Sequence, residues 1–421
     1  MSDQKNIKTR YYSLIKIVNK HNLLYHTYDS PEISDDIYDN YYSELKKIEN
    51  EYPSIISKNS PTQRVGSELL DSFEKRQHDY PMLSLSNASN ENEFRDFYNK
   101  LKKNNIKHNE KLFAEPKFDG LAVNITYEDG YYSYATTRGD GFIGEDITVN
   151  VRTIKSLPMI IDNVKLPKKF SLRGEIFIDK TDFIKINKDL IKHGLKEYSN
   201  PRNLAAGSIR QLDPSIADSR NLRLFVHGIS DPKLFSKFKS HETLFSHFNK
   251  IGFPVNKYSQ TLSSIDECID YYNKINSIRN EIPYEIDGLV YRVNDFKRYE
   301  DLGFTAKSPK WAIAYKFKSF EALTKINNVT FQVGRTGTIT PVAELEPVNI
   351  GGVNVARATL HNFSEIVSKD IHINDYVYVK GLSGGERRLG YQRGELNVTR
   401  ESTAAYNKYY TGKDYSTMWF S

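Results

Sequence analysis

The sequence predicts an α+β fold with a helical start, a mainly antiparallel middle and a small β-barrel after it. Three observations lead to this prediction. Apolar residues recur at helical spacing in residues 1–70, short strands alternate with helices over 71–318, and closely spaced strands with Gly and Pro turns occupy 319–380. A chain of 421 residues allows roughly two to four domains.

Residues 1–70 are predicted to be helical. In the stretch 33–53, Ser34 is a candidate helix cap, and Asp35 and Asp36 suit the first turn, where a carboxylate is favourable. Pro53 is expected to end the helix. Between them, the apolar positions lie three or four residues apart, at Ile37, Tyr41, Leu45 and Ile48.

Residues 71–318 combine strands and helices. The stretch 114–140 is typical of a β-hairpin that turns at Glu128, Asp129 and Gly130. Further strands are predicted at 170–178, 285–294 and 310–318, and a helical pattern covers 231–252. This mixture indicates a largely antiparallel sheet with helices beside it.

The last part of the chain changes character twice. Residues 319–380 are β-rich, and their short strands predict a small barrel. In 381–421 apolar periodicity nearly vanishes, so we expect a disordered tail and a barrel left incomplete with an unpaired strand edge.

Composition narrows the function classes. The net charge of +6 is compatible with a polyanionic partner but equally with a lysine-rich solvated surface. Cys268 is the single cysteine, so no disulfide framework and no cysteine-based zinc site are expected, which fits a reducing cytoplasm. No signal peptide or membrane span is predicted, because no apolar run approaches the necessary length.

The hexapeptide EPKFDG at 115–120 is the main chemical candidate. Strand alternation places Glu115, Lys117 and Asp119 on one face, and turns Phe118 toward a core. On 170–178, Glu175 shares a face with Arg173. Taken alone, a Lys-x-Asp-Gly motif is more often an exposed turn lysine than a nucleophile.

A nucleophilic lysine must first lose its proton, and neighbouring cations favour that loss. Arg138, Arg292 and Lys316 are candidates, and they would also neutralise phosphate oxygens. Asp287 and Arg292 have opposite parity on one predicted strand, so both reach one pocket only if the strand bends at Gly288. Carboxylates at 115, 175 and 287 could hold Mg²⁺ together with water.

Eleven ordered stretches between about residue 20 and residue 380 resemble the bacterial-type NAD⁺-dependent DNA ligases. The Lys-Phe-Asp-Gly motif is shared with ATP-dependent ligases and capping enzymes, whereas the first stretch is not. In chain order the stretches are LYHTYDSPEISDDIYD, SPTQRVG, YPMLSLSNA, EPKFDGLAV, TRGDGFIGEDITVN, LRGEIFI, NPRNLAAGSIRQLD, YEIDGLVYRVNDF, SPKWAIAYKF, VGRTGTITPVAELEPV and RATLHN.

The resemblance implies three domains: a helical NMN-binding subdomain (1–70), a mainly antiparallel nucleotidyltransferase (adenylation) domain (71–318) and a partial OB-fold barrel (319–380).

It also implies that Lys117 attacks the adenylyl phosphorus of NAD⁺, releases nicotinamide mononucleotide (NMN) and carries AMP. The AMP then passes to the 5′-phosphate of a DNA nick, and the 3′-hydroxyl displaces it, in replication and repair. Implied contacts are Glu115, Ser84 and Leu85 with the adenosine, Arg138 and Glu175 with its ribose, Arg292 and Lys316 with the nucleotide, and Glu175 and Asp287 with Mg²⁺ or Mn²⁺.

The first stretch is implied to select NAD⁺. Tyr25 and His26 would meet the nicotinamide end. Asp35, Tyr38 and Asp39 follow helical spacing and share one face, which would favour a cationic ring and repel the pyrophosphate of ATP. Asp36 and Ile37 belong to the same implied cofactor site. Without the resemblance, the stretch is more typical of a tyrosine-rich helix packed on a neighbour.

Nicked double-stranded DNA is the implied partner. Arg202 and Arg210 are candidate phosphate ligands, with helix-surface arginines as the alternative. In the barrel, Arg335, Thr336 and Arg357 lie near glycines that allow close approach to the DNA backbone. His361 lacks a nearby partner ligand in sequence and is not expected to bind a metal. We expect a monomer.

The chain departs from the family pattern in two places. Arg292 stands where the family usually has lysine; arginine keeps the charge but does not deprotonate near neutral pH. After Lys380 the resemblance stops, and we expect a truncated or frame-shifted end that weakens the grip on DNA. Two alternatives therefore remain beside a nick-sealing enzyme: a form competent only for self-adenylylation, and a non-catalytic DNA-binding remnant.

Overall fold

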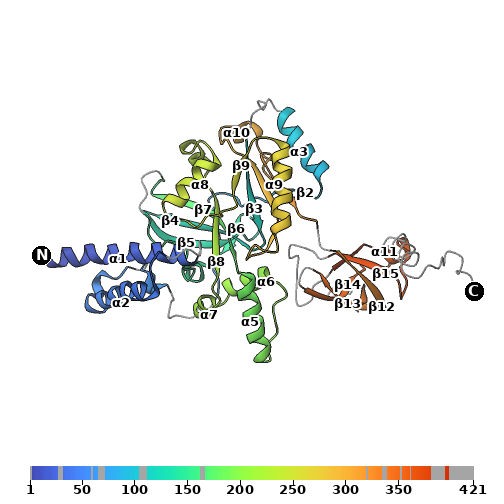
Figure 1. The fold of residues 1–421 in the computed structure, drawn as a ribbon, viewed down its shortest axis with the longest axis horizontal. Coiled ribbons are helices and arrows are strands. Elements are labelled where there is room, and N and C mark those ends of the chain that lie inside the picture. Colours follow the sequence, from blue (N-terminus) through green and yellow to red (C-terminus); the bar gives the residue numbers. More distant parts are fainter. Residues whose placement is uncertain are drawn as a thin grey trace, which may run out of the picture. The chain divides into compact units, whose positions relative to one another are not determined.

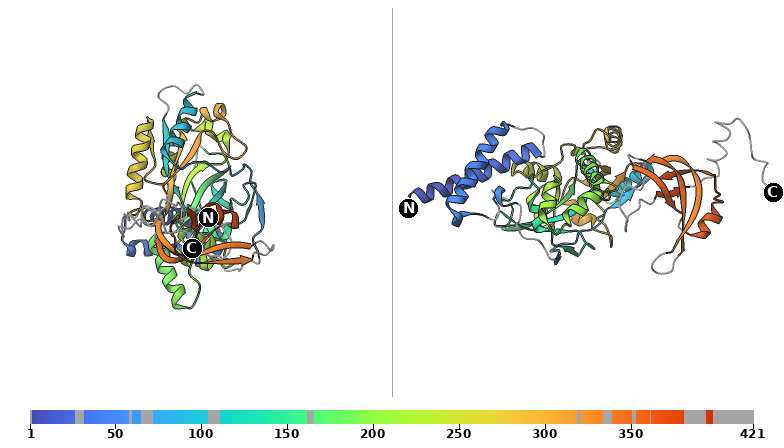
Figure 2. Two further views of the ribbon diagram at one scale, coloured as in Figure 1. Left: turned by 90° about the vertical axis from the view of Figure 1, so that its right-hand side faces the viewer. Right: turned by 90° about the horizontal axis from the view of Figure 1, so that it is seen from below.

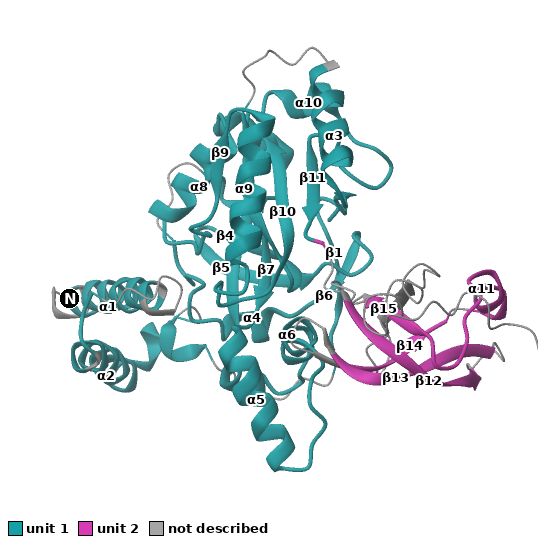
Figure 3. Ribbon diagram, turned by 45° about the vertical axis from the view of Figure 1, so that its right-hand side comes forward, with its two compact units in different colours: residues 1–317 teal, residues 318–421 magenta. Residues whose placement is uncertain are grey.

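The computed structural model describes residues 2–26, 32–57, 60–64, 72–103, 111–161, 166–318, 321–333, 339–350, 353–360, 362–380 and 394–397. The chain forms two compact units, 1–317 and 318–421 (Figure 3). The predicted boundary at 318/319 lies one residue from this division. The helical region before residue 65 and the predicted adenylation domain belong to the same unit.

Two α-helices lie side by side at the start of the first unit (Figure 1). Their shared core consists of Tyr11, Leu14, Ile15, Val18 and Leu45, all fully buried. Ser34 occupies the predicted cap position, although its side chain makes no cap hydrogen bond. The elements are α1 (Ser2–His26), α2 (Asp35–Glu51) and the 3₁₀ turns η1 (Pro53–Ile55) and η2 (Pro61–Gln63).

The rest of the first unit is built on two main sheets, whereas the sequence interpretation stacked the site strands in one. The five-stranded sheet has the order β2-β11-β10-β3-β9, and the four-stranded sheet has the order β5-β4-β7-β8. In the first sheet β2 pairs in parallel with β11, and the other pairs are antiparallel. The strands are β1 (Lys75–Gln77), β2 (Ser86–Ala88), β3 (Leu112–Phe118), β4 (Leu121–Glu128), β5 (Tyr131–Thr137), β6 (Ile143–Glu145), β7 (Lys169–Phe177), β8 (Arg223–Ile229), β9 (Gln260–Leu262), β10 (Ile286–Val293) and β11 (Ala312–Lys316).

The predicted hairpin is confirmed for β4 and β5, but the strand expected to run from residue 114 to the turn is in fact two strands: β3 belongs to the five-stranded sheet and β4 to the four-stranded sheet. The turn of the hairpin contains Asp129 at φ 48° and Gly130 at φ 82°. Two successive residues with positive φ give the turn that matches the twist of the strands it joins, and glycine tolerates that conformation best.

The other helices of the first unit lie beside these sheets, whereas α1 and α2 project from one end (Figure 2). The predicted helix over 231–252 is in fact two elements, because Ser240 and Thr243 form a capping box that starts a new helix. None of the described helices is long and apolar enough to cross a bilayer. The elements are α3 (Glu91–Lys103), α4 (Thr148–Arg152), α5 (Lys180–Lys192), α6 (Pro201–Ile209), α7 (Pro214–Ser219), η3 (Pro232–Lys237), α8 (His241–Lys250), α9 (Ile265–Ile278) and α10 (Arg298–Leu302).

The second unit is a closed barrel of order β12-β13-β14-β16-β15. This differs from the expected unfinished barrel, because β16 pairs with both β14 and β15 and comes from the segment predicted to lack order. Strand pairing uses backbone groups, so a polar stretch without apolar periodicity can still supply it. The elements are β12 (Glu321–Val333), β13 (Ile339–Ile350), β14 (Val353–Thr359), α11 (Phe363–Ser368), β15 (Tyr376–Lys380) and β16 (Gly394–Asn397).

Candidate active site

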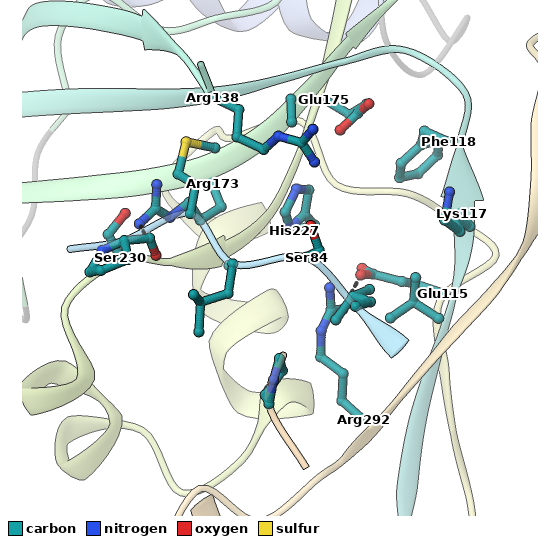
Figure 4. A pocket seen from close by; sticks show the side chains of 18 of the residues that line it. Ser84, Glu115, Lys117, Phe118, Arg138, Arg173, Glu175, His227, Ser230 and Arg292 are labelled. Atoms are coloured by element: carbon teal, nitrogen blue, oxygen red, sulfur yellow. Dashed lines mark hydrogen bonds and ion pairs between the residues drawn. The ribbon is translucent and has the colours of Figure 1, made fainter. Parts of the chain in front are cut away.

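A cavity of about 740 Å³ lies in the first unit, lined by strands of both main sheets and by residues 80–85 (Figure 4). Its volume is in the range of small-molecule sites, roughly 300–1,000 Å³. Ten of the sequence-predicted residues line it. They are Ser84, Leu85, Glu115, Lys117, Arg138, Glu175, Arg202, Arg210, Arg292 and Lys316.

Lys117 is held by a carboxylate from the neighbouring strand. Its Nζ donates to both oxygens of Asp287, at 2.8 and 2.7 Å. The two residues meet because β10 shifts register against β3 between Ile286 and Gly288, which leaves Asp287 as an extra residue. The predicted bend is therefore confirmed, and it lets Asp287 and Arg292 act in one site despite their opposite parity.

Gly288 is needed at this bend for a steric reason. A Cβ added there would lie 2.3 Å from the carbonyl oxygen of Tyr315 and 2.7 Å from Cα of Lys316. Only glycine allows β11 to approach β10 so closely. The close approach in turn places the Nζ of Lys316 3.9 Å from the Asp287 carboxylate.

The charge around Lys117 differs from the sequence expectation. That interpretation surrounded the lysine with cations, whereas its nearest charged partner is Asp287, whose side chain is only 3% exposed. Burial raises the pKa of Asp287, and the nearby Lys117 opposes that rise. The arrangement thus places a proton acceptor directly at the amine.

Glu115 and Arg292 form a second, more deeply buried pair. The Nη1 of Arg292 donates to the Oε1 of Glu115, and the side chains are 9% and 3% exposed (Figure 4). Burial raises the pKa of Glu115, and the guanidinium counteracts the rise. The arginine that departs from the family pattern therefore neutralises the acid implied to seat adenosine.

Glu175 extends into the same cavity from β7. Near it, the Nη1 of Arg202 donates to Asp119 at 2.9 Å, which joins the start of α6 to the end of the EPKFDG strand. Burial raises the pKa of Glu175 to about 7, although Arg202 and Lys117 favour its charged form. Its protonation therefore changes near neutral pH.

This pKa gives a stability prediction with a defined sign. Between pH of about 4.5 and about 7 the folded state retains the Glu175 proton that the unfolded chain has lost, so the free energy of unfolding should fall as pH rises through this window. Glu175→Gln should remove the part of this pH-dependent decrease in the free energy of unfolding that Glu175 causes. Urea denaturation at pH 5 and pH 8 measures it, with exposed Glu300→Gln as control. Equal pH dependence in the parent and Glu175→Gln would contradict the assignment.

The glycine of EPKFDG has a packing role. A Cβ at Gly120 would lie 2.2 Å from the carbonyl oxygen of Ile176 and 3.0 Å from Cγ of Glu175. Gly120→Ala should therefore lower the free energy of unfolding by about 1–3 kcal/mol, as overpacking does. Chemical denaturation measures this. Gly228→Ala is the control, because a Cβ there meets no heavy atom within 4 Å; equal losses would exclude the steric explanation.

Sequence reasoning missed part of the cavity wall. Arg173 was placed on the face of Glu175 but given no role; its Nη2 donates to the carbonyl of Tyr80 at 2.6 Å. His227 and His241 also line the cavity, and burial lowers the pKa of His227 to about 3, helped by Arg292 and Arg173. The apolar run around His227 was the available signal, since it marks the buried strand β8.

The predicted NAD⁺-selecting residues are only partly described. Tyr25, His26 and Asp35 lie at helix ends, and their side chains fall outside the described part. The side chains of Asp36 and Asp39 are exposed, as is Ile37. Tyr38 is half-buried, and its hydroxyl donates to Oδ1 of Asn22 at 2.9 Å.

The remaining candidates lie elsewhere. Arg210 donates to Glu145 at 2.7 Å at the cavity rim. On the barrel, Arg357 lies opposite Glu344 with an N–O distance of 3.6 Å. Arg335, Thr336 and His361 are outside the described residues. Within the described ranges, no three His, Cys, Asp or Glu side chains gather to hold a metal ion.

Three segments of the chain are each similar to a known protein family. Residues 4–66 match the model of the DNA ligase-like, N-terminal NAD⁺-binding domain. Residues 70–320 match the NAD-dependent DNA ligase adenylation domain, and 323–384 match the NAD-dependent DNA ligase OB-fold domain.

Curated relatives agree with these models. A protein named DNA ligase from Rickettsia massiliae is 45% identical over 364 residues, which cover 86% of this chain and 52% of that protein. A DNA ligase from Syntrophobacter fumaroxidans is 42% identical over 385 residues, 90% of this chain and 57% of that protein. The chain thus spans about half the length of these relatives. A solved structure named Pmar-Lig_Pre. aligns with a TM-score of 0.41 at 12% identity, over 84% of this chain and 70% of that one.

Proposed function

Given that the chain belongs to the NAD-dependent DNA ligase family, we propose that it transfers the adenylyl group of NAD⁺ to Lys117 and then to DNA. The position of Lys117 carries the proposal. Its amine lies at a cavity of nucleotide size, with Asp287 at hydrogen-bond distance and Glu175, Arg138 and Lys316 on the walls. A lysine on an unrelated surface turn would have none of these neighbours.

The first step needs a neutral amine, and Asp287 accepts its proton. The 2.7 Å hydrogen bond gives a direct path, and burial makes this carboxyl a better base than an exposed aspartate. The Nζ of Lys117 then forms a bond to the adenylyl phosphorus. The bond from that phosphorus to the bridging oxygen breaks, and NMN leaves with the electron pair.

The cavity walls supply the remaining contacts. Glu115, Ser84 and Leu85 seat the adenosine, and Arg138 and Glu175 hold its ribose. Arg138 and Lys316 bring positive charge to the phosphate, where it stabilises charge during transfer. Arg292 contributes by holding Glu115 in place rather than by contacting phosphate, because its guanidinium is committed to that carboxylate.

Asp287 and Glu175 are the residues that would hold Mg²⁺. Magnesium usually takes one or two protein carboxylates and completes its shell with water and substrate phosphate, so a site with two acids fits it. The ion would neutralise phosphate oxygens. Asp287 then has two successive partners, the ammonium of Lys117 and the metal, and both are cations.

We further propose that the helical region selects NAD⁺ over ATP. The exposed carboxylates of Asp36 and Asp39 give this part of α2 negative charge, which favours the cationic nicotinamide end and disfavours a triphosphate. Tyr25, His26, Asp35 and Tyr38 complete the proposed site. The match of residues 4–66 to an NAD⁺-binding domain supports it.

For the later steps we propose that AMP passes to the 5′-phosphate of a DNA nick and that the 3′-hydroxyl displaces it. The proposed phosphate contacts are Arg202 and Arg210 at the cavity, Arg357 on the barrel, and Arg335. The match of 323–384 to the ligase OB-fold domain supports a DNA-binding role for the barrel.

One experiment tests the proposal against its alternatives. The protein is incubated with Mg²⁺ and either NAD⁺ or ATP, and intact mass spectrometry detects covalent AMP. An adduct from NAD⁺ but not ATP is expected. An adduct from ATP alone would identify an ATP-using relative, and no adduct from a folded sample would favour a non-catalytic DNA-binding protein. A nicked duplex then tests sealing.

A further inference from the structure

The stretch SPTQRVG contains a buried cation that the proposed function does not use. Arg64 is 5% exposed and links the helices of 2–64 to the body of the adenylation domain. We propose that Arg64 is a positioning residue: it holds the helical region in place so that the nicotinamide end of NAD⁺ can be bound while the adenylyl end occupies the cavity. The inference rests on the proposed function.

On one side Arg64 binds main-chain carbonyls of the adenylation domain. Its Nη1 donates to Ile154 at 2.7 Å and to Arg152 at 3.3 Å, and its Nη2 donates to Leu157 at 3.0 Å. These carbonyls lie at the end of α4 and in the turns after it. Helix C-termini carry partial negative charge and free carbonyls, so this is a favourable place for a guanidinium.

On the other side Arg64 binds the helices. Its Nη2 also donates to Oδ1 of Asn19 on α1 at 3.0 Å. The preceding residues are tied to the same helices, because the Thr62 hydroxyl and the Gln63 amide both donate to Glu49 of α2. Glu49 in turn accepts from the hydroxyl of Tyr11 at 3.0 Å. The segment 60–64 is therefore fixed to the helical pair, and Arg64 extends from it to the other domain.

Arg64 is a buried cation whose acceptors are all neutral oxygens. Among the described residues no carboxylate forms an ion pair with Arg64, and its buried Nε has no hydrogen-bond partner there. Burial lowers its pKa to about 10, with the Tyr38, Tyr127 and Tyr42 hydroxyls opposing the shift. A buried charge held only by neutral acceptors depends on their geometry, so the contact constrains how the two parts meet.

Helix α1 connects Arg64 with one residue of the proposed NAD⁺ face. Asn19, which binds Arg64, is one helical turn from Asn22, which accepts from Tyr38 on α2. A second contact is apolar: Ile160 packs against both the core of the helical pair and the main core of the first unit. Apolar packing thus holds the helical pair against the adenylation domain, and the hydrogen bonds of Arg64 fix the orientation of the two parts.

The test separates the two ends of NAD⁺. In a Lys117→Ala background, which prevents adenylylation, isothermal titration measures binding of NAD⁺ and of AMP. Arg64→Met should weaken NAD⁺ binding by about tenfold or more, because the nicotinamide contacts are no longer positioned, while AMP binding stays within about twofold. With Lys117 intact, adenylylation by subsaturating NAD⁺ should fall by a similar factor.

Further variants distinguish positioning from simple structural support. Asn19→Ala should give a smaller loss of NAD⁺ binding in the same direction, and it decides the question if Arg64→Met does not fold. Arg64→Lys should recover only part of the binding, since one ammonium cannot reach all four acceptors. Arg10→Met is the control, because the Arg10–Glu44 pair lies within the helical pair.

Two results would overturn the inference. Equal losses of NAD⁺ and AMP binding in a folded Arg64→Met would show a general structural role, and unchanged NAD⁺ binding would show none. Hydrogen exchange provides a readout independent of nucleotide: amides of 152–160 should exchange faster in Arg64→Met. If the parent protein itself fails to bind NAD⁺ or form an adduct, the proposed function has failed instead.

Discussion

Replacing Lys117 with arginine is expected to abolish the covalent AMP adduct, with a loss of at least ~10³-fold in adenylylation rate. Arginine retains the positive charge and can still donate to Asp287, so the buried carboxylate keeps a partner. It does not deprotonate near neutral pH, and it therefore cannot attack phosphorus. Arginine thus tests nucleophilicity more directly than alanine, which would remove the closest charged partner of the buried Asp287.

Intact mass after incubation with NAD⁺ and Mg²⁺ measures the adduct. The matched control is Lys188→Arg, the same substitution at an exposed position of α5. It should be adenylylated as fast as the parent protein. An adduct that persists in Lys117→Arg would show that another residue is the nucleophile, and peptide mapping would then locate it.

The second large effect is expected at Arg292. Arg292→Met should lower the free energy of unfolding by about 3–5 kcal/mol, because it leaves the charge of Glu115 buried without its partner. Arg292→Lys retains a cation and should cost less, although the ammonium lacks the reach and planar shape of the guanidinium. Urea denaturation at neutral pH measures both variants.

An exposed ion pair provides the comparison. Arg10 and Glu44 are 46% and 39% exposed, and Arg10→Met should cost less than about 1 kcal/mol. If Arg292→Met were no more destabilising than Arg10→Met, the Glu115–Arg292 pair would not be the buried, mutually dependent pair that the structure shows. Adenylylation of folded Arg292→Lys then tests whether this position only holds Glu115.

Alternation along single strands predicted much of the site. It placed Glu115 with Lys117, and Arg173 with Glu175, and all four line the cavity. The parity conflict between Asp287 and Arg292 even predicted the register shift at Gly288. These features are local, so they depend on the spacing of a few residues.

Features that depend on distant partners were not predictable in the same way. Alternation cannot show that β3 and β7 belong to different sheets, because it does not identify a strand's neighbours. It cannot show that Arg292 pairs with Glu115, which is 177 positions away. The strand β16 was missed because backbone pairing leaves no apolar pattern to find.

The register shift at Asp287 leaves this residue without a partner on β3. From Gly288 to Val293 every residue of β10 has a partner on β3, and Ile286 pairs with Phe118 beyond the shift. Asp287 alone is surplus against β3, whereas on the β11 side its carbonyl accepts from the Phe317 amide at 2.9 Å. Deleting Asp287 would let Ile286 and Gly288 pair with consecutive residues of β3 in an ordinary antiparallel ladder. Deleting a residue between Leu289 and Val293 would instead turn the side chains on one side of the deletion to the wrong face. The residue proposed as the proton acceptor is in this sense an insertion that the sheet accommodates, and its deletion is expected to remove the proposed chemistry while leaving the strand order intact.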